Sequence, residues 1–195
     1  MTTPLDGRST RWDAHRAKRR QALVQAAVNA IEHHGASVRV DQIAEQADIA
    51  RPLLYRYFGD LTALQRAIIE HAQTQLLAQI SRLWQPNQPL NALVESVVVG
   101  YFAWVAQHPM LSRYCLRHTD AALVDELRQH IATQILQVLS GSPHDSKIQL
   151  PQAWALGLVG FIEAHAIWWL SQPKQESIET ISAQVSQQLL VLVKY

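Results

Sequence analysis

The sequence predicts an all-α protein of about nine helices, and three observations lead to this class. The 195 residues include only 7 glycines and 8 prolines, whereas a β-sandwich or barrel needs a turn about every 8–12 residues. Hydrophobic residues make up 48% of the chain and charged residues 17%, which is typical of a globular protein and excludes general disorder. Between the breakers, apolar residues recur at helical spacing without strand-like alternation.

Four helices are expected in the N-terminal part of the chain. They cover about residues 13–34, 40–47, 51–58 and 61–84. Gly35 ends the first of them, and Asp60 is the expected N-cap of the long fourth helix.

Five more helices are expected after the QPNQP stretch. They cover about residues 90–107, 109–118, 119–138, 151–170 and 178–192. The apolar run 153–170 contains Glu163 and His165 and lacks basic flanks. A buried helix therefore explains this run better than a membrane span.

Charge is distributed unevenly, although the formal net charge is only +1. Residues 8–20 hold six basic side chains against the single acid Asp13, while acidic residues slightly outnumber Lys and Arg after residue 70. A basic N-terminal segment on a near-neutral body indicates either a nucleic-acid contact or a solvated helix start. The one cysteine, Cys115, and the lack of a secretory h-region favour a cytoplasmic protein.

Residues 38–58 (VRVDQIAEQADIARPLLYRYF) carry the most informative pattern. Ile43 lies on the apolar side of a short helix, and Asp48 follows where the chain must turn. Asp tolerates the left-handed backbone conformation better than most residues. Leu54 and Phe58 then give a second short helix an apolar i, i+4 face. The pattern predicts a helix-turn-helix motif.

The outward face of this second helix suits a DNA major groove. Arginine pairs with guanine O6 and N7 or with phosphates, tyrosine hydroxyls reach phosphates, and leucine meets a thymine methyl. The alternative is a small helical hairpin whose aromatic residues belong to the core. The predicted outward residues are Arg51, Leu53, Tyr55, Arg56 and Tyr57.

The stretch from residue 16 to about residue 75 resembles the DNA-binding domain of the tetracycline-repressor (TetR) family of bacterial regulators. The matching segments are RRQALVQAAVNAIEHHG and DQIAEQADIARPLLYRYFGD. The resemblance implies a homodimer with residues 51–57 as the recognition helix and Arg39 as a phosphate contact. It also implies three parts: a basic arm (1–15), a DNA-binding domain (16–76) and an effector-binding and dimerisation domain (77–195).

The sequence departs from the family pattern at three positions. Asp48 replaces the turn glycine, Ala50 replaces the serine cap of the recognition helix, and Leu61 replaces a lysine that contacts phosphate. Losing the cap costs about 1 kcal/mol of helix stability. Arg8 and Arg11 are expected to compensate as a flexible arm in the minor groove.

The second domain is rich in aromatic residues that suit an apolar ligand pocket, although each of them is individually more typical of a core. Glu163 and His165 must find partners in the most apolar helix, and these can be a ligand, the dimer partner or neighbouring side chains. The candidate pocket residues are Trp84, Tyr101, Phe102, Trp104, His108, Tyr114, His118, Phe161, Glu163, His165 and Trp168.

A small-residue face on the helix 151–170, together with the last helix, predicts a four-helix dimer interface that resembles the family arrangement. Small residues allow a second helix to approach closely. The expected interface residues are Gly157, Gly160, Ala164, Ile181, Val185, Leu189 and Leu192.

The predicted function is that of a ligand-responsive transcriptional regulator. The resemblance implies a repressor, because repression is the usual mode of the family. Its expected partners are double-stranded operator DNA, a small apolar or aromatic effector and a second copy of the chain, with no membrane. No catalytic residues, metal or cofactor are expected, because Glu-x-x-His, His-Glu-x-x-His, a P-loop and Gly-x-Ser-x-Gly do not occur. A helical ligand carrier without DNA binding is the main alternative.

Overall fold

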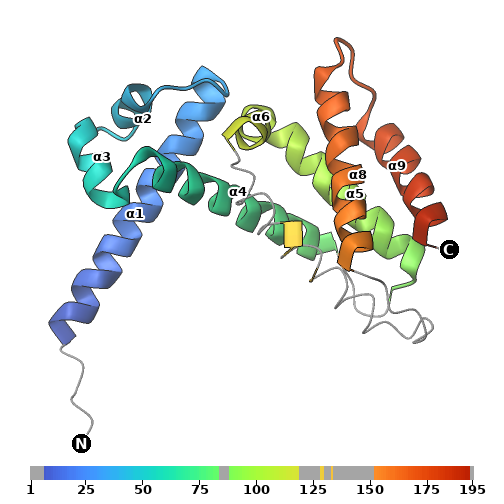
Figure 1. Cartoon of the computed structure of the whole chain (residues 1–195), viewed down its shortest axis with the longest axis horizontal. Helices are drawn as coiled ribbons and strands as arrows, with labels where there is room; N and C mark the ends of the chain where they lie inside the picture. The colour runs from blue at the N-terminus through green and yellow to red at the C-terminus, as the bar shows by residue number, and fades with distance from the viewer. Residues whose placement is uncertain (1–6, 84–87, 119–127, 130–132, 134–151, 194–195) are drawn as a thin grey trace, which may run out of the picture. The chain divides into compact units, whose positions relative to one another are not determined.

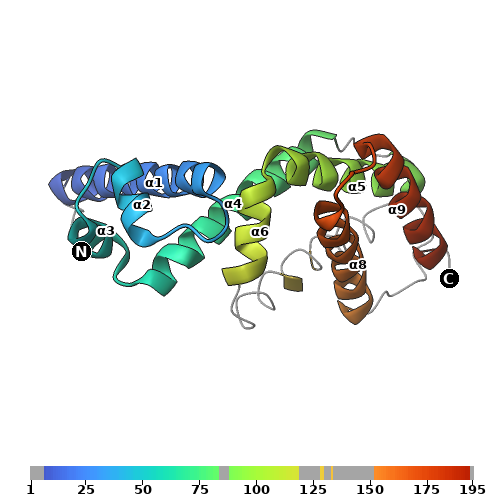
Figure 2. The same ribbon diagram turned by 90° about the horizontal axis from the view of Figure 1, so that it is seen from above.

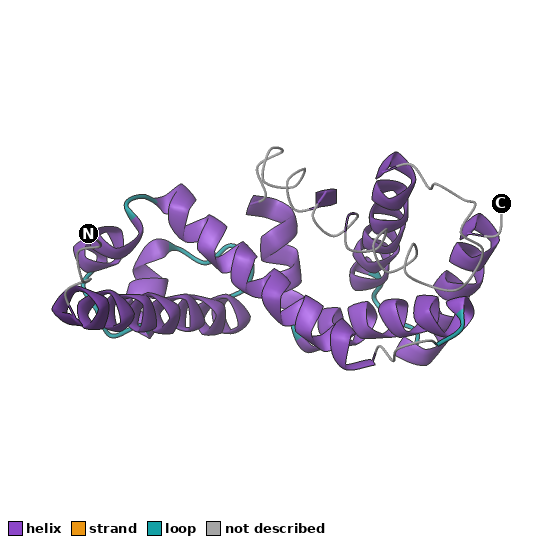
Figure 3. Cartoon of the chain, turned by 90° about the horizontal axis from the view of Figure 1, so that it is seen from below, coloured by secondary structure: helices purple, strands orange, loops and turns teal. Residues whose placement is uncertain are grey.

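The chain folds into helices joined by short loops. The computed structural model describes residues 7–83, 88–118, 128–129, 133 and 152–193. Every described segment is helix, turn or loop, and Figure 3 shows no strand among these residues. The all-α class is therefore confirmed. The chain divides into two units, one made of residues 1–72 with 110–118 and the other of residues 73–109 with 119–195.

The first unit is built on the helix α1. It contains α1 (Gly7–His34), α2 (Val40–Gln46), α3 (Arg51–Phe58) and the first half of α4 (Leu61–Leu83). α1 packs against both α2 and α3 (Figure 1). The apolar residues that recur at helical spacing along α1 are buried, and they share the core with residues from the next three helices. These core residues are Leu23, Ala27, Ile31, Ile43, Leu54, Leu64 and Ile68.

α1 starts earlier than the sequence analysis expected. Its backbone is helical from Gly7, so the prediction that Arg8 and Arg11 lie in a flexible arm is wrong. Residues 8–20 contain no glycine or proline that would break a helix, and α1 is already held in the core from Leu23 on, so its extension towards the N-terminus needs no new nucleus. Trp12 and residues 14–22 are exposed, and burial begins at Leu23. The basic segment is thus a helical extension.

The turn between α2 and α3 has the predicted conformation. Asp48 has a φ of 51°, which is the left-handed region. The N–H of the next residue, Ile49, donates to the carbonyl of Ala44 at 3.1 Å and closes the turn. After α3, Gly59 also has a positive φ of 91°. The N-cap prediction for Asp60 is confirmed, because its Oδ1 accepts the Ala63 N–H at 2.7 Å.

Asp48→Val is expected to lower the free energy of unfolding by about 1–2 kcal/mol, because a β-branched side chain is disfavoured at positive φ. Asp48→Asn is the matched control, since Asn tolerates the same conformation. Its change should stay within about 0.5 kcal/mol. Chemical denaturation of both variants checks this, and equal losses would contradict the role of the turn.

The short helix α6 (Pro109–His118) belongs to the first unit from Met110 onward. The Glu32 carboxylate of α1 accepts the Leu111 N–H at 3.0 Å and the Met110 N–H at 3.4 Å. It thereby caps the free N–H groups at the start of α6. At the other end, Arg117 donates to Ser37 Oγ at 2.6 Å. The sequence analysis assigned these residues to the second domain, because nothing local in the sequence marks this long-range capping.

Burial anchors α6 further. The side chains of Leu111 and Tyr114 are buried, and Gln65 Nε2 lies 3.1 Å from His118 Nδ1. Burial also raises the pKa of Tyr114 and of the Cys115 thiol to about 12. α6 is therefore an integral part of the first unit.

Glu32→Ala is expected to lower the free energy of unfolding by about 1–2 kcal/mol, because it leaves the first N–H groups of α6 without their cap. Glu45, an exposed acid on α2, provides the control Glu45→Ala, which should cost less than about 0.5 kcal/mol. Hydrogen exchange of the Leu111 amide should accelerate only in Glu32→Ala. Unchanged protection of that amide would show that the cap is dispensable.

The second unit contains the end of α4, α5 (Leu90–Gln107), α8 (Gln152–Ser171) and α9 (Ile178–Val193). α5 lies along α9, and both also contact α8 (Figure 2). A Cβ at Gly100 of α5 would lie 3.1 Å from Ile80 Cγ1, so the glycine allows α4 and α5 to approach closely. The helix expected over 119–138 lies outside the described residues, apart from helical residues at 128–129 and 133.

α8 is, by length and composition, apolar enough to cross a membrane. One of its faces is buried within the second unit, through residues that include Ala155, Ile162 and Trp169. A core helix passes the same length and composition test, so this property alone does not indicate a membrane span.

Candidate nucleic-acid interface

The orientation of α3 follows from its two buried residues. Leu54 is 0% exposed and Phe58 is 8% exposed, one helical turn apart. This pair fixes the rotation of α3 about its own axis, because the other residues must then lie on the flanks or outside. Pro52 lies in the first turn, where its missing N–H costs nothing. As predicted, Ala50 supplies no side-chain cap.

The residues predicted to face DNA occupy the remaining surface of α3. Arg51 and Arg56 are exposed, and Leu53, Tyr55 and Tyr57 are half-buried. The surface of this short helix that the core leaves free therefore carries two exposed cations and two half-buried aromatic rings. Their roles in DNA binding remain predictions.

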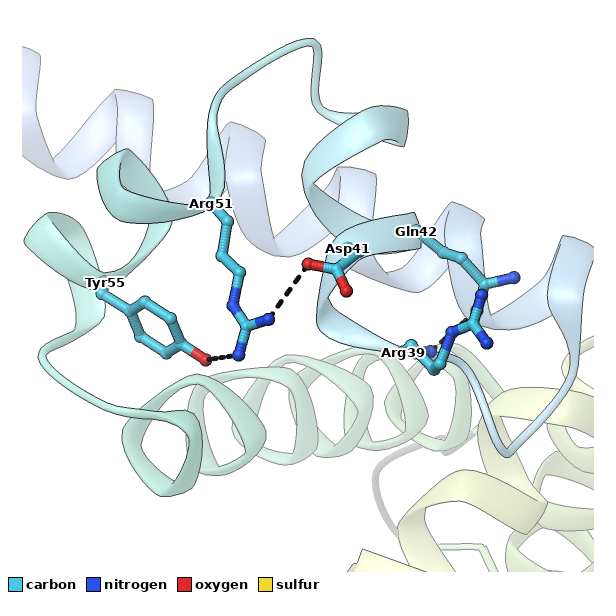
Figure 4. A network of polar contacts seen from close by, with 5 residues as sticks. All are labelled: Arg39, Asp41, Gln42, Arg51 and Tyr55. Atoms are coloured by element: carbon cyan, nitrogen blue, oxygen red, sulfur yellow. Dashed lines mark hydrogen bonds and ion pairs between the residues drawn. The ribbon is translucent and has the colours of Figure 1, made fainter.

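Arg39 lies at the start of α2 and is also exposed. Its backbone N–H donates to Gln42 Oε1 at 2.8 Å (Figure 4), so the turn before α2 is closed by a side chain of the helix itself. This bond fixes the backbone at Arg39 without using the guanidinium. The phosphate contact predicted for Arg39 remains a prediction.

The Arg51 side chain lies between the two helices of the motif (Figure 4). Its Nη1 donates to Asp41 Oδ1 at 3.2 Å, and its Nη2 donates to the Tyr55 hydroxyl at 3.2 Å. Its guanidinium carbon is 5.5 Å from the centre of the Tyr55 ring. The Tyr55 hydrogen bond, followed by the charges of Tyr55 and Asp41, raises the pKa of Arg51. The sequence analysis did not single out Asp41, because its distance from Arg51 depends on the turn.

A second cation reaches α3 from α1. The Arg20 guanidinium carbon lies 4.9 Å from the centre of the Phe58 ring. Arg20 thus covers the last buried aromatic of α3 while its own charge stays in water. The sequence did not indicate this packing role, because Arg20 is one of several basic residues in the same segment.

The residues predicted for a ligand pocket are divided between the two units. Tyr114 and His118 belong to the first unit, where their rings lie 4.3 Å apart. Trp84 lies outside the described residues. The others belong to the second unit, and they are Tyr101, Phe102, Trp104, His108, Phe161, Glu163, His165 and Trp168.

Within the second unit, several of these aromatic residues are core. Phe102 and Trp104 are buried, and the Phe102 ring meets the Trp169 ring edge-on at 5.8 Å. Trp168, by contrast, is 51% exposed. Trp104 Nε1 and the hydroxyls of Ser182 and Ser186 are buried without a hydrogen-bond partner among the described residues. These three polar groups are therefore the candidate anchors of a ligand.

The polar groups of α8 have partners within the chain. Glu163 accepts from Arg128 Nε at 2.9 Å and from Arg128 Nη2 at 2.6 Å. His165 Nδ1 lies 2.8 Å from the Phe161 carbonyl oxygen. Of the alternatives left open for this pair, neighbouring groups of the same chain therefore satisfy both residues.

The residues predicted for a dimer interface also fall into two groups. Ile181, Val185 and Leu189 are buried inside one chain, where the apolar stripe of α9 packs on α5, so they are core and not surface. Gly157, Gly160, Ala164 and Leu192 are at least partly exposed, and a Cβ built at either glycine meets nothing within 4 Å.

Comparison with known proteins decides what the first unit is. The family profile described as "Bacterial regulatory proteins, tetR family" matches residues 23–68, which run from the buried part of α1 into α4. A solved tetR-family transcriptional regulator from Streptomyces coelicolor superposes with a TM-score of 0.69 at 28% identity, over 90% of this chain and 80% of that one. The chain belongs to the tetR family.

This TetR-family protein is a DNA-binding transcriptional regulator. It is similar to the uncharacterized HTH-type transcriptional regulator Rv0472c of Mycobacterium tuberculosis, at 26% identity over 93% of this chain and 80% of the relative. The HTH-type transcriptional regulator BetI of Agrobacterium fabrum is 33% identical, over 39% of each chain. The family and fold are those of regulators and not of enzymes. Within the described residues, no group of three or more His, Cys, Asp or Glu side chains could hold a metal ion.

Proposed function

We propose that this regulator is a cytoplasmic, homodimeric repressor that binds a palindromic operator and is released by a small apolar or aromatic effector. The observation that carries the DNA-binding part is the burial of Leu54 and Phe58. It leaves Arg51 and Arg56 on the exposed surface of α3. Arginine is the side chain best suited to guanine edges and phosphates in a major groove.

The proposed dimer uses the exposed face of α8 and the end of α9. Gly157, Gly160 and Ala164 form a flat strip on α8. The apolar side chains of Ile167, Trp168, Val191 and Leu192 are exposed in the same two helices. A two-fold contact between such faces would bury them against a second copy. The dimer would present two recognition helices about 34–36 Å apart, or one DNA turn.

The proposed effector site lies among the buried polar groups of the second unit. Trp104 Nε1 and the hydroxyls of Ser182 and Ser186 lie in a largely apolar interior, and a few polar anchors in such an interior are typical of small-molecule sites. The chain passes between the units at residues 72–73, 109–110 and 118–119. An effector that favours a different arrangement of these connections would release DNA, with a coupling of about 1–3 kcal/mol.

Arg56→Ala is the sharpest test of DNA binding by α3. Selection of bound fragments from the source genome should first give an enriched site for the wild-type protein. Arg56→Ala should then bind that site about tenfold or more weakly, because it loses a base or phosphate contact. Arg82→Ala removes another exposed cation, at the end of α4, and should change affinity little. If the wild type enriches no sequence, the helical ligand carrier becomes the better description.

Gly160→Trp is expected to convert the dimer into monomers, because the indole would fill the strip where the partner helix approaches. Multi-angle light scattering measures the mass directly. Glu45→Trp places the same side chain on the exposed surface of α2 and should leave the dimer intact. If the Gly160→Trp protein still has the mass of a dimer, the interface lies on another surface.

A further inference from the structure

We infer that Asp41 is a specificity-determining positioning residue, which holds Arg51 in the orientation that reads one base pair in each half-site. This inference rests on the proposed DNA-binding function of α3 and concerns a residue outside the recognition helix. The observation behind it is the contact of Arg51 with side chains from both helices of the motif (Figure 4).

The Arg51 guanidinium is held at both of its terminal nitrogens. Arg51 is the first residue of α3, and Asp41 lies in the first turn of α2. The Asp41 oxygen holds Nη1, and the Tyr55 hydroxyl holds Nη2, each at 3.2 Å. With both terminal nitrogens held and the Tyr55 ring alongside, the plane of the guanidinium is fixed instead of rotating freely. A side chain ordered before binding loses less entropy when it contacts DNA.

The Arg51 guanidinium has enough donors for its protein partners and for a base. A guanidinium has five N–H groups in a rigid fork. Asp41 and Tyr55 use two of them, so three remain when only the described part of the chain is considered. A bidentate contact to guanine O6 and N7 needs two. Arg51 can therefore keep both protein partners and still read a guanine.

The acid at position 41 acts on DNA recognition more than on folding. The side chains of Arg51 and Asp41 are 52% and 64% exposed, and an ion pair that is this exposed contributes little to folding stability. A carboxylate next to a DNA-binding surface also repels phosphates. Asp41 thus lowers affinity for any DNA backbone, while its hold on Arg51 favours the sequences that offer the right base. The repulsion acts on all sequences alike, so it is the hold on Arg51 that increases the ratio of specific to non-specific binding.

A test compares the full-length wild type with Asp41→Ala, Arg51→Ala, the double variant and Glu45→Ala in selections from a randomised duplex pool. Glu45→Ala removes one negative charge from the same helix, α2, without touching Arg51. Asp41→Ala should lose the preference at one base pair in each half-site, the same pair as Arg51→Ala. Discrimination at that pair should fall about tenfold, while other positions keep theirs. Adding Asp41→Ala to Arg51→Ala should change the selected sequence no further.

Binding to a non-specific duplex and thermal unfolding complete the test. Asp41→Ala and Glu45→Ala should tighten non-specific binding by similar factors, because each removes one negative charge. An unchanged selected sequence in Asp41→Ala would overturn the inference and leave only a charge effect. A uniform loss of preference at all positions with a lowered unfolding temperature would also overturn it, in favour of a structural role. A wild type that selects no sequence would instead overturn the proposed function itself.

Discussion

The burial of Leu54 and Phe58 against the first unit's core is the constraint on which the recognition surface depends. A helix of eight residues has little stability of its own, so tertiary packing must hold it. Because the two buried residues lie one turn apart, they fix both the position of α3 and its rotation. Exposure of Arg51 and Arg56 is a direct consequence of this packing.

Polar contacts then refine what the apolar pair positions. Arg20 covers the Phe58 ring from α1, and Asp41 holds Arg51 from α2. Such contacts are individually weak at a surface, yet they determine where a charged side chain points. Glu32 extends the same principle to α6, because its carboxylate ties a helix that is distant in sequence to the DNA-binding unit. The regulator is therefore organised by a buried apolar core and a layer of directed polar contacts.

Much of this organisation could be predicted from sequence, for reasons that are local. Breakers such as Gly35 and Gly59 mark helix ends, and the positive φ of Asp48 follows from the tight turn between two short helices that each bury one apolar face. What was missed depends on long-range packing. Nothing in the sequence of α9 shows that Ile181 meets its own chain instead of a partner, and nothing near Asp41 reveals its distance from Arg51. Apolar periodicity shows which face of a helix is buried, but not which surface buries it.

The most direct measurement is a map of backbone amide chemical shifts during titration with a duplex that carries the selected site. This titration tests whether the exposed face of α3, set by its buried pair, contacts the bases. The largest changes are expected at Arg39 and residues 51–57, and α8 and α9 should change little. Largest changes elsewhere, with residues 51–57 unaffected by saturating DNA, would contradict it.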